Sequence, residues 1–132
     1  MSRSAAVPEL WTLAHTDAMT EDDYISQLRA GWPKDSDASL AVVALADEAV
    51  RAFPQSARLW LMRGDLIQIG PKSCPHPLEE ALRSYQRAIE IDPQFVDAWD
   101  EIGHYHDAVL ADETGAQKYF REAQRLRGHH VG

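Results

Sequence analysis

Two segments decide the fold: residues 60–67 read WLMRGDLI, and residues 99–106 read WDEIGHYH. Each segment begins with a tryptophan and has a glycine four residues later, and the tryptophans at 60 and 99 are 39 residues apart. A single tryptophan or glycine carries no information. An ordered pair that recurs with the same spacing predicts an internal repeat.

A second pattern, made of small residues around a larger one, occurs three times. It reads Ala81-x3-Tyr85-x2-Ala88-x4-Pro93, Val42-x3-Ala46-x2-Ala49-x4-Pro54 and Ala116-x3-Phe120-x2-Ala123. Small residues let two helices approach closely, and the aromatic ring fills the remaining gap. The chain is therefore expected to alternate between a helix with the Trp-Gly pair and a helix with the second pattern.

Capping residues and prolines divide the chain into helices, and no stretch shows the alternation of β-branched and polar residues that a strand needs. Helices are expected near 8–14, over 20–31, 37–53 and 56–69, from 77 to the Asp92-Pro93 break, from there to about 111, and over 113–127. The segment 70–77 has three prolines and a glycine, so it is predicted to be a loop. The sequence therefore predicts an all-α protein.

This ordered set of Trp, Gly, small residue, aromatic and Pro resembles the tetratricopeptide repeat family. The resemblance implies one domain of stacked antiparallel helical hairpins, a right-handed α-solenoid of about six to seven helices. We expect an N-terminal extension with a short helix over 1–19, a degenerate first hairpin over 20–53, repeats over 54–92 and 93–127, and a frayed tail over 128–132.

The sequence departs from the family pattern at several points. The spacing of 39 residues between Trp60 and Trp99 exceeds the usual period of about 34, and the proline-rich loop accounts for the excess. Arg63 stands where an apolar residue precedes the glycine, His106 stands where Tyr is expected, and Gly128 lies near the position of the last Pro. A loop insertion of this kind is compatible with stacking because it leaves the packed faces unchanged.

Composition limits the classes of function. The chain has 132 residues, 45% of them hydrophobic, and a formal net charge of -8, so one globular domain that repels nucleic acid and anionic lipid is expected. The single cysteine, Cys74, rules out an intrachain disulfide, and the apolar run before Pro8 is too short for a signal peptide or a membrane span. We expect a cytoplasmic protein whose partners are basic.

The resemblance also implies a binding surface, because in tetratricopeptide proteins the first helix of each hairpin lines a concave groove that binds a peptide or a partner helix. The candidate groove residues are Arg58, Leu61, Met62, Asp65, Asp97, Asp100, Glu101, His104 and Asp107. They predict an apolar floor at Leu61 and Met62 beside an acidic wall, suited to a segment that mixes basic and apolar side chains. The alternative is a solvated acidic helix face.

The sequence leaves two other classes of function open. An uncovered outer side of the last helix, 113–127, would favour a self-assembling scaffold that forms a homodimer rather than a monomer. Asp100, His104 and Asp107, with His106 or the Cys74-Pro75-His76 loop, offer a metal-dependent or thiol enzyme as a further alternative. Because HExxH, paired CxxC, GxSxG and phosphate-binding glycine loops are all absent from the sequence, we expect a non-enzymatic protein without metal or cofactor.

Overall fold

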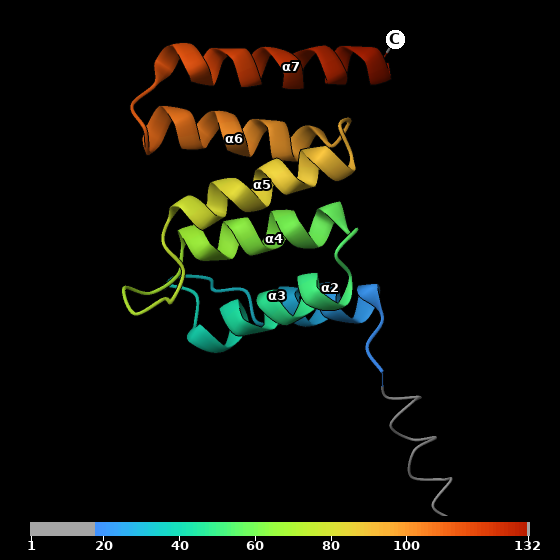
Figure 1. The fold of residues 1–132 in the computed structure, drawn as a ribbon, viewed down its shortest axis with the longest axis vertical. Helices are drawn as coiled ribbons and strands as arrows, with labels where there is room; N and C mark the ends of the chain where they lie inside the picture. The colour runs from blue at the N-terminus through green and yellow to red at the C-terminus, as the bar shows by residue number, and fades with distance from the viewer. Residues whose placement is uncertain (1–17, 132) are drawn as a thin grey trace, which may run out of the picture.

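A computed structural model describes residues 18–131, with side chains up to residue 128, and in this part of the chain it contains six α-helices and no strand. The helices are α2 (Glu21–Ala30), α3 (Leu40–Ala52), α4 (Ala57–Gln68), α5 (Glu79–Ile91), α6 (Val96–Ala108) and α7 (Glu113–Val131). Figure 1 shows them stacked along the long axis, from α2 and α3 at one end to α7 at the other. The all-α hairpin prediction is confirmed; the predicted helix at 8–14 lies outside the described residues.

Most helices begin where the sequence places a capping side chain. The Thr20 hydroxyl accepts from the backbone N–H of Asp23, whose carboxylate accepts from the backbone N–H of Thr20, which completes a capping box for α2. At α3 and α4 the hydroxyl groups of Ser39 and Ser56 accept from the backbone N–H three residues later, at 3.1 and 3.2 Å, without the reciprocal bond. Helix α3 therefore begins three residues after the predicted Asp37.

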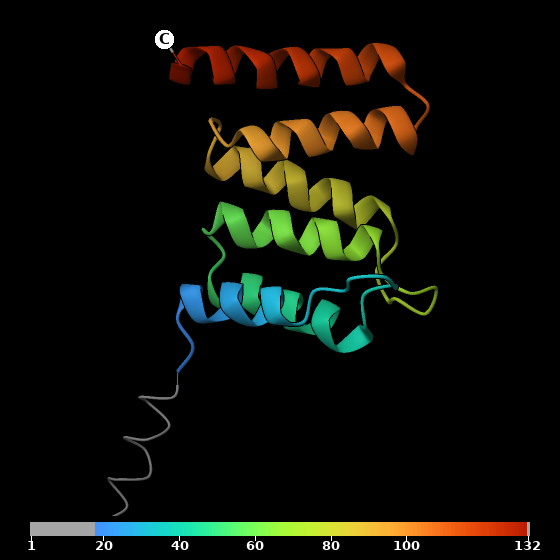
Figure 2. The ribbon, with the colours of Figure 1, turned by 180° about the vertical axis from the view of Figure 1, so that it is seen from behind.

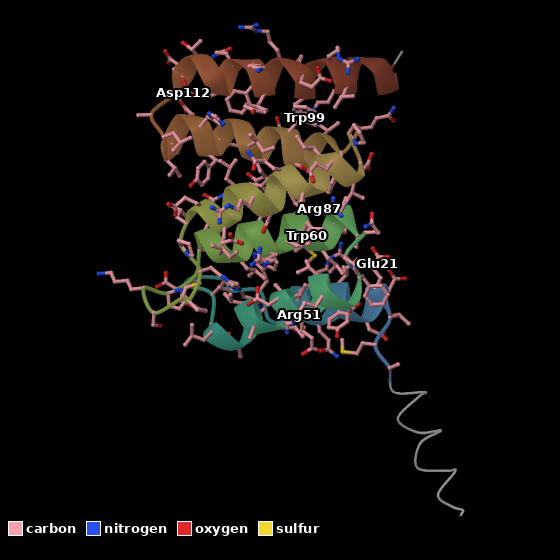
Figure 3. All side chains as sticks on the ribbon, viewed as in Figure 1. Glu21, Arg51, Trp60, Arg87, Trp99 and Asp112 are labelled. Atoms are coloured by element: carbon pink, nitrogen blue, oxygen red, sulfur yellow. The ribbon has the colours of Figure 1, made fainter. Side chains whose placement is uncertain are left out.

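The two tryptophans have equivalent settings, which supports the repeat. The indole N–H of Trp60 donates to the carbonyl oxygen of Pro54 at 3.0 Å, and that of Trp99 donates to the carbonyl oxygen of Pro93 at 2.8 Å. Figure 3 shows both residues one above the other along the stack. Each hairpin therefore ties its first helix to the proline that precedes it.

The glycines of the repeat lie where an aromatic ring of the second helix packs. A Cβ at Gly64 would lie 2.5 Å from Cε1 of Tyr85, and a Cβ at Gly103 would lie 2.5 Å from Cε1 of Phe120. Carbon atoms normally pack no closer than about 3.5 Å. The predicted close approach between the helices of each hairpin is therefore present in both repeats.

Helix α4 is buried on two sides. Leu59, Met62 and Leu66 pack into a cluster with α2 and α3, whereas Leu61 and Ile67 pack into a second cluster with α5 and α6. A helix that is apolar on most sides is expected to be buried in this way. The two clusters make α4 the centre of the stack.

Two of the departures from the repeat pattern, Arg63 and the inserted loop, contact the same carboxylate, that of Asp47. Arg63 is only 8% exposed; its Nε lies 2.9 Å from Oδ1 of Asp47, and its Nη1 lies 2.7 Å from the Ser84 hydroxyl. The other oxygen of Asp47 lies 2.7 Å from Nε2 of His76 in the loop. Figure 2 shows this loop protruding from the side of the stack between α4 and α5. Asp47 therefore contacts both the buried Arg63 and the inserted loop.

The C-terminal end differs from the prediction. Helix α7 continues to Val131, beyond its predicted end at Arg127 and into residues 128–132, which are predicted to fray. Gly128 does not end the helix: no described glycine has a positive φ, and nothing lies within 4 Å of a Cβ built at Gly128. The glycine therefore keeps the helical conformation in the described part of the chain.

Among the described residues, none of the helices combines the length and apolar character that a membrane span requires.

Candidate functional site

A hollow of about 250 Å³ lies between α4 and α6, the first helices of two successive hairpins. It is lined by Leu61, Asp65, Asp97, Asp100, Glu101 and His104. All six belong to the groove set predicted from the sequence. Residues three, four and seven positions apart share one face of a helix, so Asp97, Asp100, Glu101 and His104 form one wall.

The inner part of this groove holds a partly buried carboxyl group, that of Asp65 on α4. It lines the hollow together with Glu101 on α6. The Tyr85 hydroxyl donates to Oδ1 of Asp65 at 2.6 Å, and the Gln68 amide donates to that hydroxyl at 2.7 Å. Burial and the nearby carboxyl groups both disfavour the ionised form of Asp65.

The surroundings of Asp65 raise the pKa of its carboxyl group. Burial of the carboxyl group, followed by its hydrogen bond to Glu101 and the charges of Glu101 and Asp97, raises the pKa of Asp65 to about 8, although the bond from Tyr85 acts in the opposite direction. Burial and the nearby Asp65 charge raise the pKa of the Tyr85 hydroxyl, so it remains a donor. At neutral pH the inner groove therefore carries less negative charge than its sequence suggests.

The rim of the groove carries a contact that the sequence analysis missed. Arg127 on α7 pairs with the Asp100 carboxylate on α6. From the sequence alone, Arg127 would be only a favourable charge near the negative end of the last helix. The two residues are 27 positions apart, and no local pattern indicates that the hairpin brings them together.

Three predicted groove residues do not line the hollow. Met62 is 6% exposed and packs toward α2 and α3, because adjacent residues on a helix point in different directions and Leu61 takes the groove side. Arg58 lies 5.5 Å over the ring of Phe95. Asp107 is exposed near the end of α6, three residues beyond His104. The predicted apolar floor therefore reduces to Leu61.

His106 and Cys74, which the sequence offers for metal or thiol chemistry, pack against other residues of the protein. In the part of the chain that the structure describes, no three His, Cys, Asp or Glu side chains are arranged to hold a metal ion. His106 pairs its Nδ1 with Asp112 at 3.0 Å and stacks on Tyr119 at a centroid distance of 4.9 Å. Cys74 is half-buried and packs against the first hydrophobic cluster.

The arrangement defines the chain as a tetratricopeptide-like helical solenoid, on the evidence of its paired helices and of its likeness to solved structures. "Crystal structure of MamA" matches with a TM-score of 0.71 and 20% sequence identity, covering 96% of this chain and 69% of that one. "MamA RS-1 ArsTM double mutant" matches with a TM-score of 0.59 and 19% identity, covering 68% of this chain and 47% of that one. At these identities the likeness concerns the fold.

This chain therefore spans less than half the length of one of these structures and about two thirds of the other. No protein-family model matches the chain, and no curated protein matches it.

Proposed function

We propose that this chain is a non-enzymatic protein-interaction module that binds a peptide or a partner helix in the groove between α4 and α6. The observation that carries the proposal is the hollow lined by four carboxyl side chains and Leu61. The helical-solenoid fold adds support, because stacked hairpins create extended concave surfaces that many repeat proteins use for binding.

The charge and shape of the groove favour a partner that mixes basic and apolar side chains. Asp97 is exposed at the groove wall, and Leu61 offers an apolar contact at its base. A complementary cation gains attraction at such a wall and also reaches it faster at low salt, where screening is weak. Affinity is therefore expected to fall as the salt concentration rises.

A self-assembling scaffold was the alternative, and the outer side of α7 does not favour it. Its exposed side chains are polar, and the large exposed hydrophobic residues of the described chain lie elsewhere. The exposed polar residues on α7 are Glu113, Thr114, Gln117, Lys118, Arg121, Gln124, Arg125 and Arg127. A polar outer face is what a solenoid end needs in order to stay soluble.

Charge reversal in the groove tests the proposal. The variant Asp97→Lys with Glu101→Lys should bind a labelled peptide of alternating arginine and leucine about tenfold more weakly, about 1.4 kcal/mol. The matched control is Asp35→Lys with Asp37→Lys, which makes the same charge change at exposed positions in the loop before α3. Binding is measured by fluorescence anisotropy at low salt, with circular dichroism as the check on folding.

The control separates the groove from overall charge. If both double variants lose the same affinity, binding follows net charge and the groove is not the site. If a peptide of alternating glutamate and leucine binds as well as the arginine peptide, the proposed partner chemistry is wrong.

A further inference from the structure

A basic side chain of the protein itself occupies the rim of the groove. Nη2 of Arg127 on α7 pairs with Oδ2 of Asp100, and Asp100 is one of the carboxylates that line the hollow. A guanidinium group is thus bound at a position where a basic partner would place its own cation.

Solvent reaches both side chains of this ion pair, so another cation can replace Arg127 at Asp100. The Arg127 side chain is 49% exposed and that of Asp100 is 24% exposed. Ion pairs that water reaches contribute little to stability, and neither residue belongs to the two hydrophobic clusters. Arg127 can therefore leave Asp100 without unfolding the hairpin.

A neighbouring arginine on the same helix behaves differently. Arg125 pairs with Glu122, one turn earlier on α7, with its Nε 3.0 Å from Oε1. Its bond stays within α7, whereas that of Arg127 crosses to α6. The two residues carry the same charge in the same part of the helix, so Arg125 is a matched control for Arg127.

The surroundings of Asp65 make the other carboxyl groups of the hollow more important for a basic partner. The pKa of Asp65 is raised by burial, so Asp97, Asp100 and Glu101 are the remaining acidic side chains that the groove presents. Because Arg127 pairs with Asp100, the charge of the Asp100 carboxylate is already compensated when a cation of the partner approaches.

We propose that Arg127 is an internal competitor for the groove, and that a basic side chain of the partner displaces it from Asp100. This inference rests on the proposed function of the groove. It assigns to the end of α7 a regulatory role: any change that removes Arg127 from Asp100, or removes its charge, raises the affinity of the groove for basic segments.

The test compares Arg127→Gln with Arg125→Gln, using the labelled arginine–leucine peptide at low salt. Both variants remove one positive charge from the same helix, so long-range attraction for the peptide increases equally. Release of Asp100 should make Arg127→Gln bind roughly two- to fivefold more tightly than Arg125→Gln, the range expected from an exposed ion pair. In an Asp100→Asn background this difference should disappear, because the two residues act as one pair.

The outcomes separate this inference from the proposed function. Equal affinities of Arg127→Gln and Arg125→Gln, together with weak binding by the Asp97→Lys, Glu101→Lys variant, would overturn the competitor role and leave the groove as the binding site. If charge reversal in the groove has no effect, the proposed function fails and the competitor role fails with it. A difference that persists in the Asp100→Asn background would also overturn the role.

Discussion

Gly64→Ala tests the close approach that defines each hairpin. The added Cβ would lie 2.5 Å from Cε1 of Tyr85, about 1 Å inside normal carbon contact. The ring cannot easily move away, because Tyr85 is 0% exposed and its hydroxyl is bonded to Asp65 and Gln68. Overpacking costs about 1–3 kcal/mol, disturbed hydroxyl bonds add about 1 kcal/mol, and helix propensity returns about 1 kcal/mol.

We therefore expect Gly64→Ala to lower the free energy of unfolding by about 2 kcal/mol, which lowers Tm by roughly 8 °C for a chain of this size. Thermal and urea unfolding followed by circular dichroism measure both values. Gly103→Ala should cost less, because its neighbour Phe120 is only half-buried and has no hydroxyl bonds to lose.

Gly128→Ala is the control, because nothing lies within 4 Å of its added Cβ. It should leave stability unchanged or raise it by up to about 1 kcal/mol. If Gly64→Ala proves as stable as Gly128→Ala, the reasoning about the hairpin contact is refuted.

Three further substitutions probe other parts of the structure. Asp65→Asn should make the free energy of unfolding less dependent on pH. The folded wild-type chain keeps a proton on the Asp65 carboxyl up to about pH 8, whereas the unfolded chain loses that proton near pH 4. The wild-type free energy of unfolding therefore falls as the pH rises from about 4 to about 8. Arg63→Leu restores the apolar residue of the repeat pattern yet should destabilise by about 3 kcal/mol in urea unfolding, because it leaves the Asp47 carboxylate without its buried partner; a stable variant would contradict this. Ala111→Gly should raise the free energy of unfolding by about 0.5–1 kcal/mol, seen as a slightly higher Tm, because Ala111 has a φ of 51° that glycine adopts without strain.

The helices and their order could be predicted because their signals are local. Proline, glycine and capping hydroxyls act on neighbouring residues, so Thr20 and Ser56 marked the starts of α2 and α4 correctly. The pairing of Gly64 with Tyr85 also follows from sequence, because the repeat supplies the same small and aromatic positions twice.

The groove could be predicted only in part. Spacing along α6 placed its four polar residues on one face, but the choice between Leu61 and Met62 depends on how α4 is rotated against both neighbours. The pairing of Arg127 with Asp100 depends on where the end of α7 crosses α6. Such contacts between distant residues require the tertiary arrangement, and no single-sequence pattern contains it.

The burial of α4 on both sides has a consequence for how the protein can be divided. Cutting the chain before α4 would strip the cover from Met62 and Leu66, and cutting after it would expose Leu61 and Ile67. Neither fragment would keep a closed interior, so isolated hairpins should aggregate or remain unfolded. The described helices from α2 to α7 should therefore melt in one cooperative transition, because α7 packs on α6 as the second helix of the last hairpin. A shortened version made for binding studies should retain all of them.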